Sequence, residues 1–158
     1  MVDILLLQTV SIVIASAGVF VAAIYYILQI RHQTKTRQTD LVMRLYSTFG
    51  SREHMEAYRE IMAMEAKDFD KLPEKYAPIQ STTVSTVCAF YEGIGVLLHR
   101  RLIDIKLVDD LFSTPIIQIW EKTEHWVKEN RKRWKRPQIW EYFEYLYNEM
   151  KKREQKGA

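Results

Sequence analysis

Residues 4–30 form an apolar run without a single charged side chain. An uncharged apolar run longer than about 18 residues is typical of a helix that spans a membrane. At about 1.5 Å per residue this run makes a helix of about 40 Å, which exceeds a hydrocarbon core of about 30 Å. We therefore expect residues 1–30 to form a transmembrane anchor that tilts in the bilayer.

A cleaved signal peptide is the alternative interpretation, because Ala15, Ser16 and Ala17 resemble a cleavage site. A signal peptide has a basic start and a short apolar core. No Lys or Arg precedes this run, and its apolar residues continue well past Ala17. A retained helix is therefore the favoured interpretation.

Basic residues flank the run on one side only. Arg31, Lys35 and Arg37 follow it, and none precedes it. Basic residues next to a membrane helix remain on the cytoplasmic side. We expect a single-pass protein of the inner (plasma) membrane, with its N-terminus outside and its C-terminal domain in the cytoplasm.

Small and polar residues recur along the run at intervals of three and four. This spacing places them on one helix face, where small residues let two backbones approach closely. The face predicts self-association, although small residues are also common in membrane helices generally. Its members, called the stripe below, are Gln8, Ser11, Ala15, Gly18, Ala22, Tyr25 and Gln29.

The remaining sequence carries helix signals and no strand signals. We expect a juxtamembrane helix over residues 31–50 that ends at Gly50, and a cytoplasmic helical bundle over residues 51–158. Ser51 is expected to cap the first helix of the bundle, and Asp104 a later one. The fold class is therefore all-α. The later helices are expected over residues 79–99, 104–112, 114–134 and 137–152, with a loop over residues 68–78.

Composition narrows the classes of function. The chain holds 23 basic and 20 acidic residues, a mild excess that suits anionic lipid and argues against a dedicated nucleic-acid binder. Its one cysteine, Cys88, excludes an internal disulfide and a Cys-built metal site. The four histidines form no pair spaced for a helix-borne zinc site, and no Gly-rich phosphate loop is present. No metal or cofactor is expected.

Several short segments follow one another in a characteristic order. The order resembles a family of small prokaryotic single-pass membrane proteins that have a helical cytoplasmic domain of unknown function. The resemblance extends over residues 5–150 and implies the topology, but no activity. Arg101 departs from it, because such proteins carry a small residue before the Leu-Ile-Asp turn. The segments are FYEGIGVLLHRRLID at 90–104, DDLF at 109–112, Trp120, Arg131, and FEYL at 143–146.

Glu92 and Glu144 stand next to aromatic residues. A carboxylate in apolar surroundings must be paired or protonated. We expect structural ion pairs that join helices, with Arg131 as a partner and Arg100 and Arg101 as further candidates. General acid–base catalysis is the alternative, and no catalytic residue is assigned.

A basic segment, NRKRWKR, occupies residues 130–136. Cations beside an indole suit anionic headgroups or nucleic-acid phosphates, and they are also common at a solvated helix end. Together with the residues that follow the anchor, this segment gives the expected lipid-binding set. The set is Arg31, Lys35, Arg37, Arg131, Lys132, Arg133, Trp134, Lys135 and Arg136.

These features favour a non-enzymatic assembly or scaffold protein, anchored in the membrane and self-associating through the stripe. In one alternative the oligomer is a pore that encloses Gln8 and Gln29, and in another a monomer binds a cytoplasmic protein through exposed aromatic residues. A membrane-tethered helical nuclease of cell defence is a further alternative. It is disfavoured because no Arg is followed by His four to six residues later.

Overall fold

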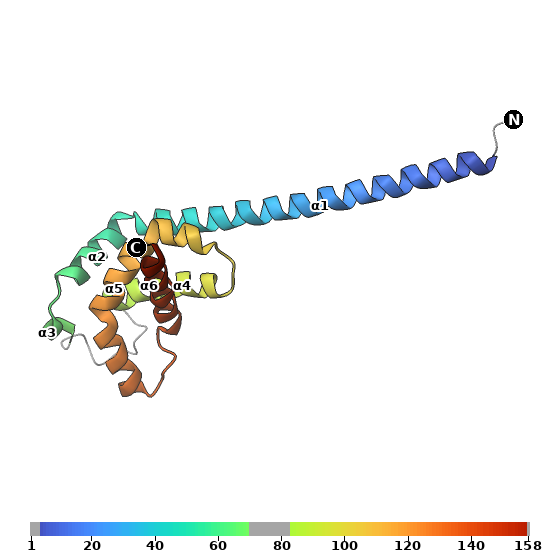
Figure 1. Cartoon of the computed structure of the whole chain (residues 1–158). Coiled ribbons are helices and arrows are strands. Elements are labelled where there is room, and N and C mark those ends of the chain that lie inside the picture. The colour runs from blue at the N-terminus through green and yellow to red at the C-terminus, as the bar shows by residue number, and fades with distance from the viewer. Residues whose placement is uncertain (1–3, 70–82, 158) are drawn as a thin grey trace. The chain divides into compact units, whose positions relative to one another are not determined.

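The computed structural model describes residues 4–69 and 83–157, and all regular secondary structure in these two stretches is helical (Figure 1). This confirms the all-α prediction. The helices are α1 (Ile4–Phe49), α2 (Arg52–Ala63), α3 (Ala66–Phe69), α4 (Thr83–His99), α5 (Ile105–Trp134) and α6 (Glu141–Gly157).

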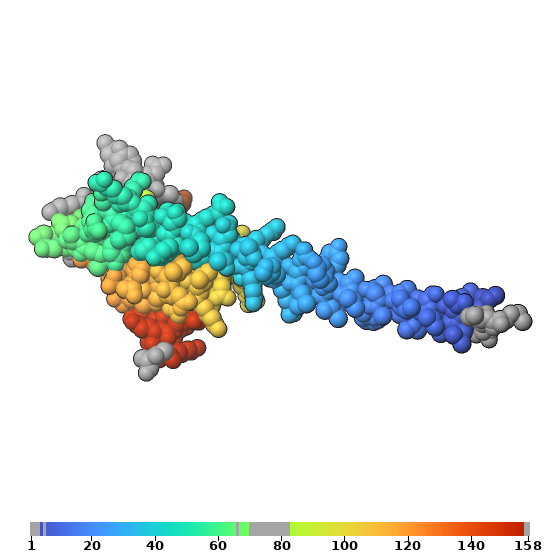
Figure 2. Space-filling view, turned by 90° about the horizontal axis from the view of Figure 1, so that it is seen from above, coloured from blue at the N-terminus to red at the C-terminus, as the bar shows by residue number. Residues whose placement is uncertain are grey.

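The chain divides into two units, residues 1–38 and residues 39–158. The first unit contains most of α1, and every described side chain from residue 6 to residue 37 is exposed (Figure 2). Its best 18-residue window has a mean hydropathy of 2.2, so α1 is long and apolar enough to cross a membrane. A signal sequence meets the same criterion.

No break separates the expected anchor from the expected juxtamembrane helix, because α1 continues from Ile4 to Phe49. Residues 31–40 contain neither glycine nor proline, so nothing local interrupts the helix. The helix ends one residue before Gly50, as expected, and the Gly50 N–H donates to the carbonyl of Tyr46 at 2.9 Å.

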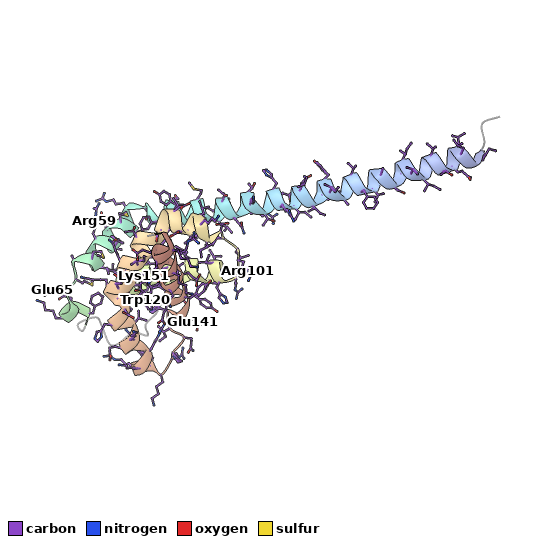
Figure 3. All side chains as sticks on the ribbon, viewed as in Figure 1. Arg59, Glu65, Arg101, Trp120, Glu141 and Lys151 are labelled. Atoms are coloured by element: carbon purple, nitrogen blue, oxygen red, sulfur yellow. The ribbon has the colours of Figure 1, made fainter. Side chains whose placement is uncertain are left out.

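The core of the second unit lies where one face of α4 meets α5 and α6. The ring of Tyr91 stacks on Phe143 with centroids 5.1 Å apart, and Trp120 meets Phe143 edge to face at 5.0 Å. Trp120 is almost fully buried within the bundle (Figure 3). Helical spacing placed Ile116, Ile119, Trp120, Thr123 and Val127 on one face of α5, and all five are buried.

Two helix caps are confirmed. The Ser51 hydroxyl accepts a hydrogen bond from the His54 N–H at 3.2 Å and caps α2. The Asp104 carboxylate accepts from the Lys106 N–H at 2.7 Å and caps α5. Both caps satisfy backbone donors that have no partner inside their own helix.

The predicted break between two helices at residue 113 is wrong. The helices expected over 104–112 and 114–134 are one helix, α5, with Pro115 inside it. Proline removes one backbone donor and kinks a helix, and Figure 1 shows that α5 changes direction along its length. The buried side chains of Phe112 and Ile116 on either side keep the two halves in the core.

The last helix begins at Glu141 instead of at residue 137, because residues 137–140 form turns. Trp140 ends this turn in the left-handed region, with φ at 55°. The helix then continues to Gly157, five residues beyond the expected end. Residues 79–82 of the expected 79–99 helix and residues 70–78 of the expected loop lie outside the described residues.

Candidate functional site

All seven members of the stripe are exposed on α1. Gly18 has open space around it, since a Cβ placed there would meet no atom within 4 Å. The Ser11 hydroxyl donates to the carbonyl of Leu7 at 2.9 Å, so its polarity is satisfied within its own helix. Among the described residues, no hydrogen bond involves the side-chain amides of Gln8 and Gln29. These amides are polar groups of the stripe without a partner among the described residues, as is the Tyr25 hydroxyl.

A second cluster lies where α4 meets the N-terminus of α6. The Glu92 carboxylate accepts a hydrogen bond from the Phe143 N–H at 2.7 Å and another from the Tyr142 N–H. Burial raises the pKa of Glu92, and these two hydrogen bonds oppose the rise. A carboxylate at this position satisfies donors that α6 leaves unpaired in its first turn. Glu92 thus caps α6 from a neighbouring helix.

Gly95, three residues after Glu92, explains how close the two helices come. A Cβ at Gly95 would lie 2.1 Å from the carbonyl oxygen of Tyr142. A Cβ at Gly93 would meet no atom within 4 Å. Sequence analysis does not separate these two glycines, because both stand in the same apolar helical pattern.

Arg131 joins the end of α5 to the start of α6. Its Nη1 forms an ion pair with Glu144 Oε2 at 2.5 Å, and its Nε donates to the carbonyl of Ile139 at 2.8 Å. The Arg131 side chain is mostly buried. Arg100 and Arg101, the other candidate partners, are exposed in the turn after α4 (Figure 3). Arg131 therefore pairs with Glu144, whereas Glu92 interacts with backbone groups.

Arg101 adopts the left-handed conformation, with φ at 57°. The Leu102 N–H donates to the carbonyl of Leu97 at 2.9 Å, which closes the end of α4 in the manner of a Schellman motif. This conformation favours glycine, which has no Cβ, and less often Asn or Asp. Arg101 therefore carries backbone strain that a glycine at this position would avoid.

Sequence analysis missed a groove between α2 and α4, with a volume of about 770 Å³. Its lining includes three carboxylates of α2, Glu53, Glu56 and Glu60, and the buried ring of His54. The Thr83 hydroxyl donates to Glu60 Oε2 at 3.0 Å. Helical spacing could have predicted that His54 is buried, because position 54 lies seven residues, or about two turns, before the buried Ile61.

The His54 ring lies among aromatic rings, with centroids 4.6 Å from Phe90 and 5.3 Å from Phe49. Its Nε2 is buried and makes no hydrogen bond to any residue that the structure describes. Burial lowers the pKa of His54, so the ring is neutral at pH 7. A neutral ring enclosed by aromatic neighbours behaves as part of the core.

A family model matches residues 12–150, and the family is described as a domain of unknown function, DUF4760. The chain belongs to the DUF4760 family. The match confirms that the resemblance seen in the sequence is to an uncharacterised family, and it includes most of the apolar run as well as the bundle. No curated protein and no solved structure matches the chain.

The basic segment of this DUF4760 protein is divided between two environments. Arg131 is held inside the α5–α6 connection, whereas Lys132, Arg133, Lys135 and Arg136 are exposed. Lys132 pairs with Glu129 at 3.0 Å, and Trp134 is 39% exposed. The three basic residues after the apolar run are exposed on α1. Arg131 is therefore mostly shielded from any lipid headgroup, whereas lipid binding by the exposed members of the set stays a prediction.

The clusters of this DUF4760 protein are suited to holding helices together. The described residues include no group of three His, Cys, Asp or Glu side chains that could hold a metal. Cys88 is buried, and burial raises its pKa to about 12, so its thiol stays protonated at neutral pH. Glu92, Arg131 and Glu144 are each engaged with the start of α6 or the connection that precedes it.

Proposed function

We propose that this DUF4760 protein is a single-pass membrane protein that self-associates through the stripe of α1. Its helical bundles are then gathered at the membrane surface as an assembly platform that performs no chemistry itself. The observation that carries the proposal is the exposed face of α1, where Gly18 leaves room for a second backbone. Van der Waals packing between small residues is a main source of helix association in lipid.

The amides of Gln8 and Gln29 add a second reason for association. A polar group in hydrocarbon needs a partner, because no water is present to replace one. Neither amide has a partner among the described side chains, whereas the hydroxyls of Ser11 and Ser16 bond to their own helix. A second copy of the helix brings a matching amide to each of these positions.

Two alternatives receive less support. The centre of the stripe is Ala15, Gly18 and Ala22, which are apolar residues that pack together better than they line a water-filled pore. Docking of a cytoplasmic protein through exposed aromatic residues has less support, since the exposed aromatic residues described in the second unit, Tyr46 and Trp134, lie on different helices. Self-association through α1 is therefore the stronger proposal.

The test is native mass spectrometry of the full-length protein in lipid nanodiscs. The wild type is expected to be a defined oligomer, and a variant with Gln8→Leu and Gly18→Leu a monomer, because it loses an amide and gains a bulky side chain on the stripe. The matched control, Val13→Leu with Phe20→Leu, changes exposed residues on the opposite side of the helix. A monomeric wild type, or an oligomer that survives the stripe substitutions, contradicts the proposal.

A further inference from the structure

The end of α1 in the second unit has one buried side and one exposed side. Val42 is fully buried in the core, and Leu41, Leu45 and Phe49 pack against it. Met43 is 51% exposed and Tyr46 is 42% exposed. Only four large hydrophobic residues described in this unit are exposed, and these two are neighbours on one helix face. The others are Leu102 and Trp134.

The exposed pair continues the register of the stripe. Met43 stands three heptads after Ala22, and Tyr46 stands three heptads after Tyr25. The intervening positions of the same register are Gln29, His32, Thr36 and Thr39, and α1 is helical through all of them. In two helices that wind around each other with a seven-residue repeat, all of these positions lie on the side that faces the partner.

We infer that the Met43–Tyr46 face binds a second copy of this chain, so that two α1 helices form a parallel seam from the membrane to the bundle. The inference rests on the proposed self-association and extends it beyond the membrane. The helices must be parallel, because both copies insert with the same orientation. The occupant of the face is thus the same helix of another copy.

Charge supports this occupant. Each seven-residue repeat of a paired helix has two core positions, called a and d. In a parallel pair, the residue directly before a first core position (a) lies close to the residue of the partner helix whose number is five higher. The first core positions recur every seven residues from Ala22 to Met43, and Thr36 is one of them. Lys35 comes directly before Thr36, so Lys35 of one copy faces Asp40 of the other. Both side chains are exposed, and Asp40 also pairs with Arg44 of its own helix at 3.0 Å. Opposite charges at these positions favour the parallel, in-register pair.

The middle of the seam is polar, with His32, Thr36 and Thr39 at its core positions. Polar core residues weaken a helix pair but restrict its register. The small residues of the stripe at one end and Met43 and Tyr46 at the other supply the apolar contacts. Such a seam transmits the pairing of the membrane helices directly to the bundles.

Cysteine cross-linking in membranes of the full-length protein tests the inference. Cys88 is buried with its pKa raised to about 12, so the native thiol gives little background. Three single variants are compared under the same oxidant: Met43→Cys on the proposed seam, Ala22→Cys on the stripe, and Arg44→Cys as an exposed control beside the seam. We expect Met43→Cys and Ala22→Cys to form covalent dimer at least about fivefold faster than Arg44→Cys.

The outcomes separate the two proposals. Cross-linking at Ala22→Cys with Met43→Cys no faster than Arg44→Cys overturns the seam and leaves the membrane stripe standing. Cross-linking at neither position contradicts both, and cross-linking at Met43→Cys alone overturns a continuous seam.

A charge exchange tests the register independently. In the Met43→Cys background, Lys35→Asp places two acidic residues together and is expected to slow cross-linking several-fold. Adding Asp40→Lys to Lys35→Asp is expected to restore the rate, because the opposite charges then face each other in reverse order. A rate that does not respond to Lys35→Asp, or a double exchange without recovery, rules out this register.

Discussion

Gly95 and Gly93 stand two residues apart on α4, yet only one of them is required by the packing. The Gly95 backbone lies so close to α6 that a Cβ would approach the Tyr142 carbonyl oxygen to 2.1 Å, whereas a Cβ at Gly93 meets nothing. The obstacle at Gly95 is backbone, which cannot move aside as a flexible side chain does. The close contact also brings the Glu92 carboxylate within reach of the first N–H groups of α6.

Gly95→Ala is expected to destabilise the fold by about 1–3 kcal/mol, because α4 and α6 must separate to admit the methyl group. Gly93→Ala is the matched control and is expected to be neutral or to stabilise by up to about 1 kcal/mol, since alanine is the better helix former. Denaturant unfolding of the full-length protein in detergent, followed by circular dichroism, measures both. Equal stabilities for the two variants would show that the helices do not meet at Gly95.

Glu92 makes the stability of the contact between α4 and α6 depend on pH. Burial raises its pKa above 4.5, so the folded protein holds the proton more tightly than the unfolded chain does. The stability that this group contributes is fully present below pH 4.5 and is lost as pH rises through the raised pKa. Glu92→Gln removes this loss, because the amide oxygen still accepts hydrogen bonds from α6 without carrying a charge.

We therefore expect Glu92→Gln to gain stability relative to the wild type as pH rises from about 4 to about 7. Unfolding by denaturant at a series of pH values measures the difference. Glu53→Gln is the control, since Glu53 is exposed in the first turn of another helix, α2. A difference that stays constant with pH would show that the ionisation of Glu92 is not coupled to folding.

At the scale of elements, the connection between α5 and α6 depends on one side chain. Lys135 and Trp140 both adopt left-handed backbone conformations in this connection, which cost free energy for residues other than glycine. Arg131 offsets this cost by holding the Ile139 carbonyl and Glu144 together. Its Nη2 is buried without a hydrogen bond to any described residue, so the contact is close but not fully satisfied.

Arg131→Gln is expected to lower the free energy of unfolding by about 1–3 kcal/mol, because hydrogen bonds to a charged group are lost and Glu144 is left without its cation. Lys132→Gln is the control, since the exposed Lys132–Glu129 pair contributes about 0–1 kcal/mol. Thermal unfolding compares the two variants. If Arg131 instead binds lipid from the surface, its substitution will weaken binding to anionic vesicles and leave stability unchanged.

Pro115 shows the limit of local signals for elements. Thr114 followed by proline is a good helix start, and local reasoning therefore divided α5 into two helices. The same residues also fit inside a helix that bends, provided that the core holds both halves. Phe112 and Ile116 are both buried, so the core does hold both halves of α5. Their burial depends on neighbouring helices, which a local sequence pattern does not reveal.

At the scale of the whole molecule, the charges that follow the apolar run decide the proposed orientation. With Arg31, Lys35 and Arg37 on one side and no basic residue on the other, the bundle is expected to stay in the cytoplasm. Replacing all three by Gln and inserting three Lys after Met1 is expected to invert a large fraction of the molecules. Protease accessibility of the bundle in intact cells and in inverted vesicles measures the orientation.

The control for this experiment is the insertion of three Gln after Met1 with the native basic residues retained. It is expected to leave the bundle protected in intact cells. If this control is also inverted, or if the wild-type bundle is already accessible from outside, the charges after the run do not determine the orientation.

Local sequence determined the helical class, the long apolar helix, the caps at Ser51 and Asp104, and the buried face of α5. These features depend on hydrophobic spacing and on side chains that act within one turn of their own backbone. Such information is complete in any short window of the chain. The stripe belongs to this class, because a helix face is defined by spacing alone.

The tertiary structure alone decided which distant groups meet. Glu92 accepts from a backbone donor 51 residues later in the chain, and Arg131 rather than Arg100 or Arg101 pairs with Glu144. The need for glycine at position 95 and the burial of His54 likewise appear only when neighbouring helices are in place. Local pattern says which face of a helix is buried, but the partner of each group on that face follows from how the helices pack.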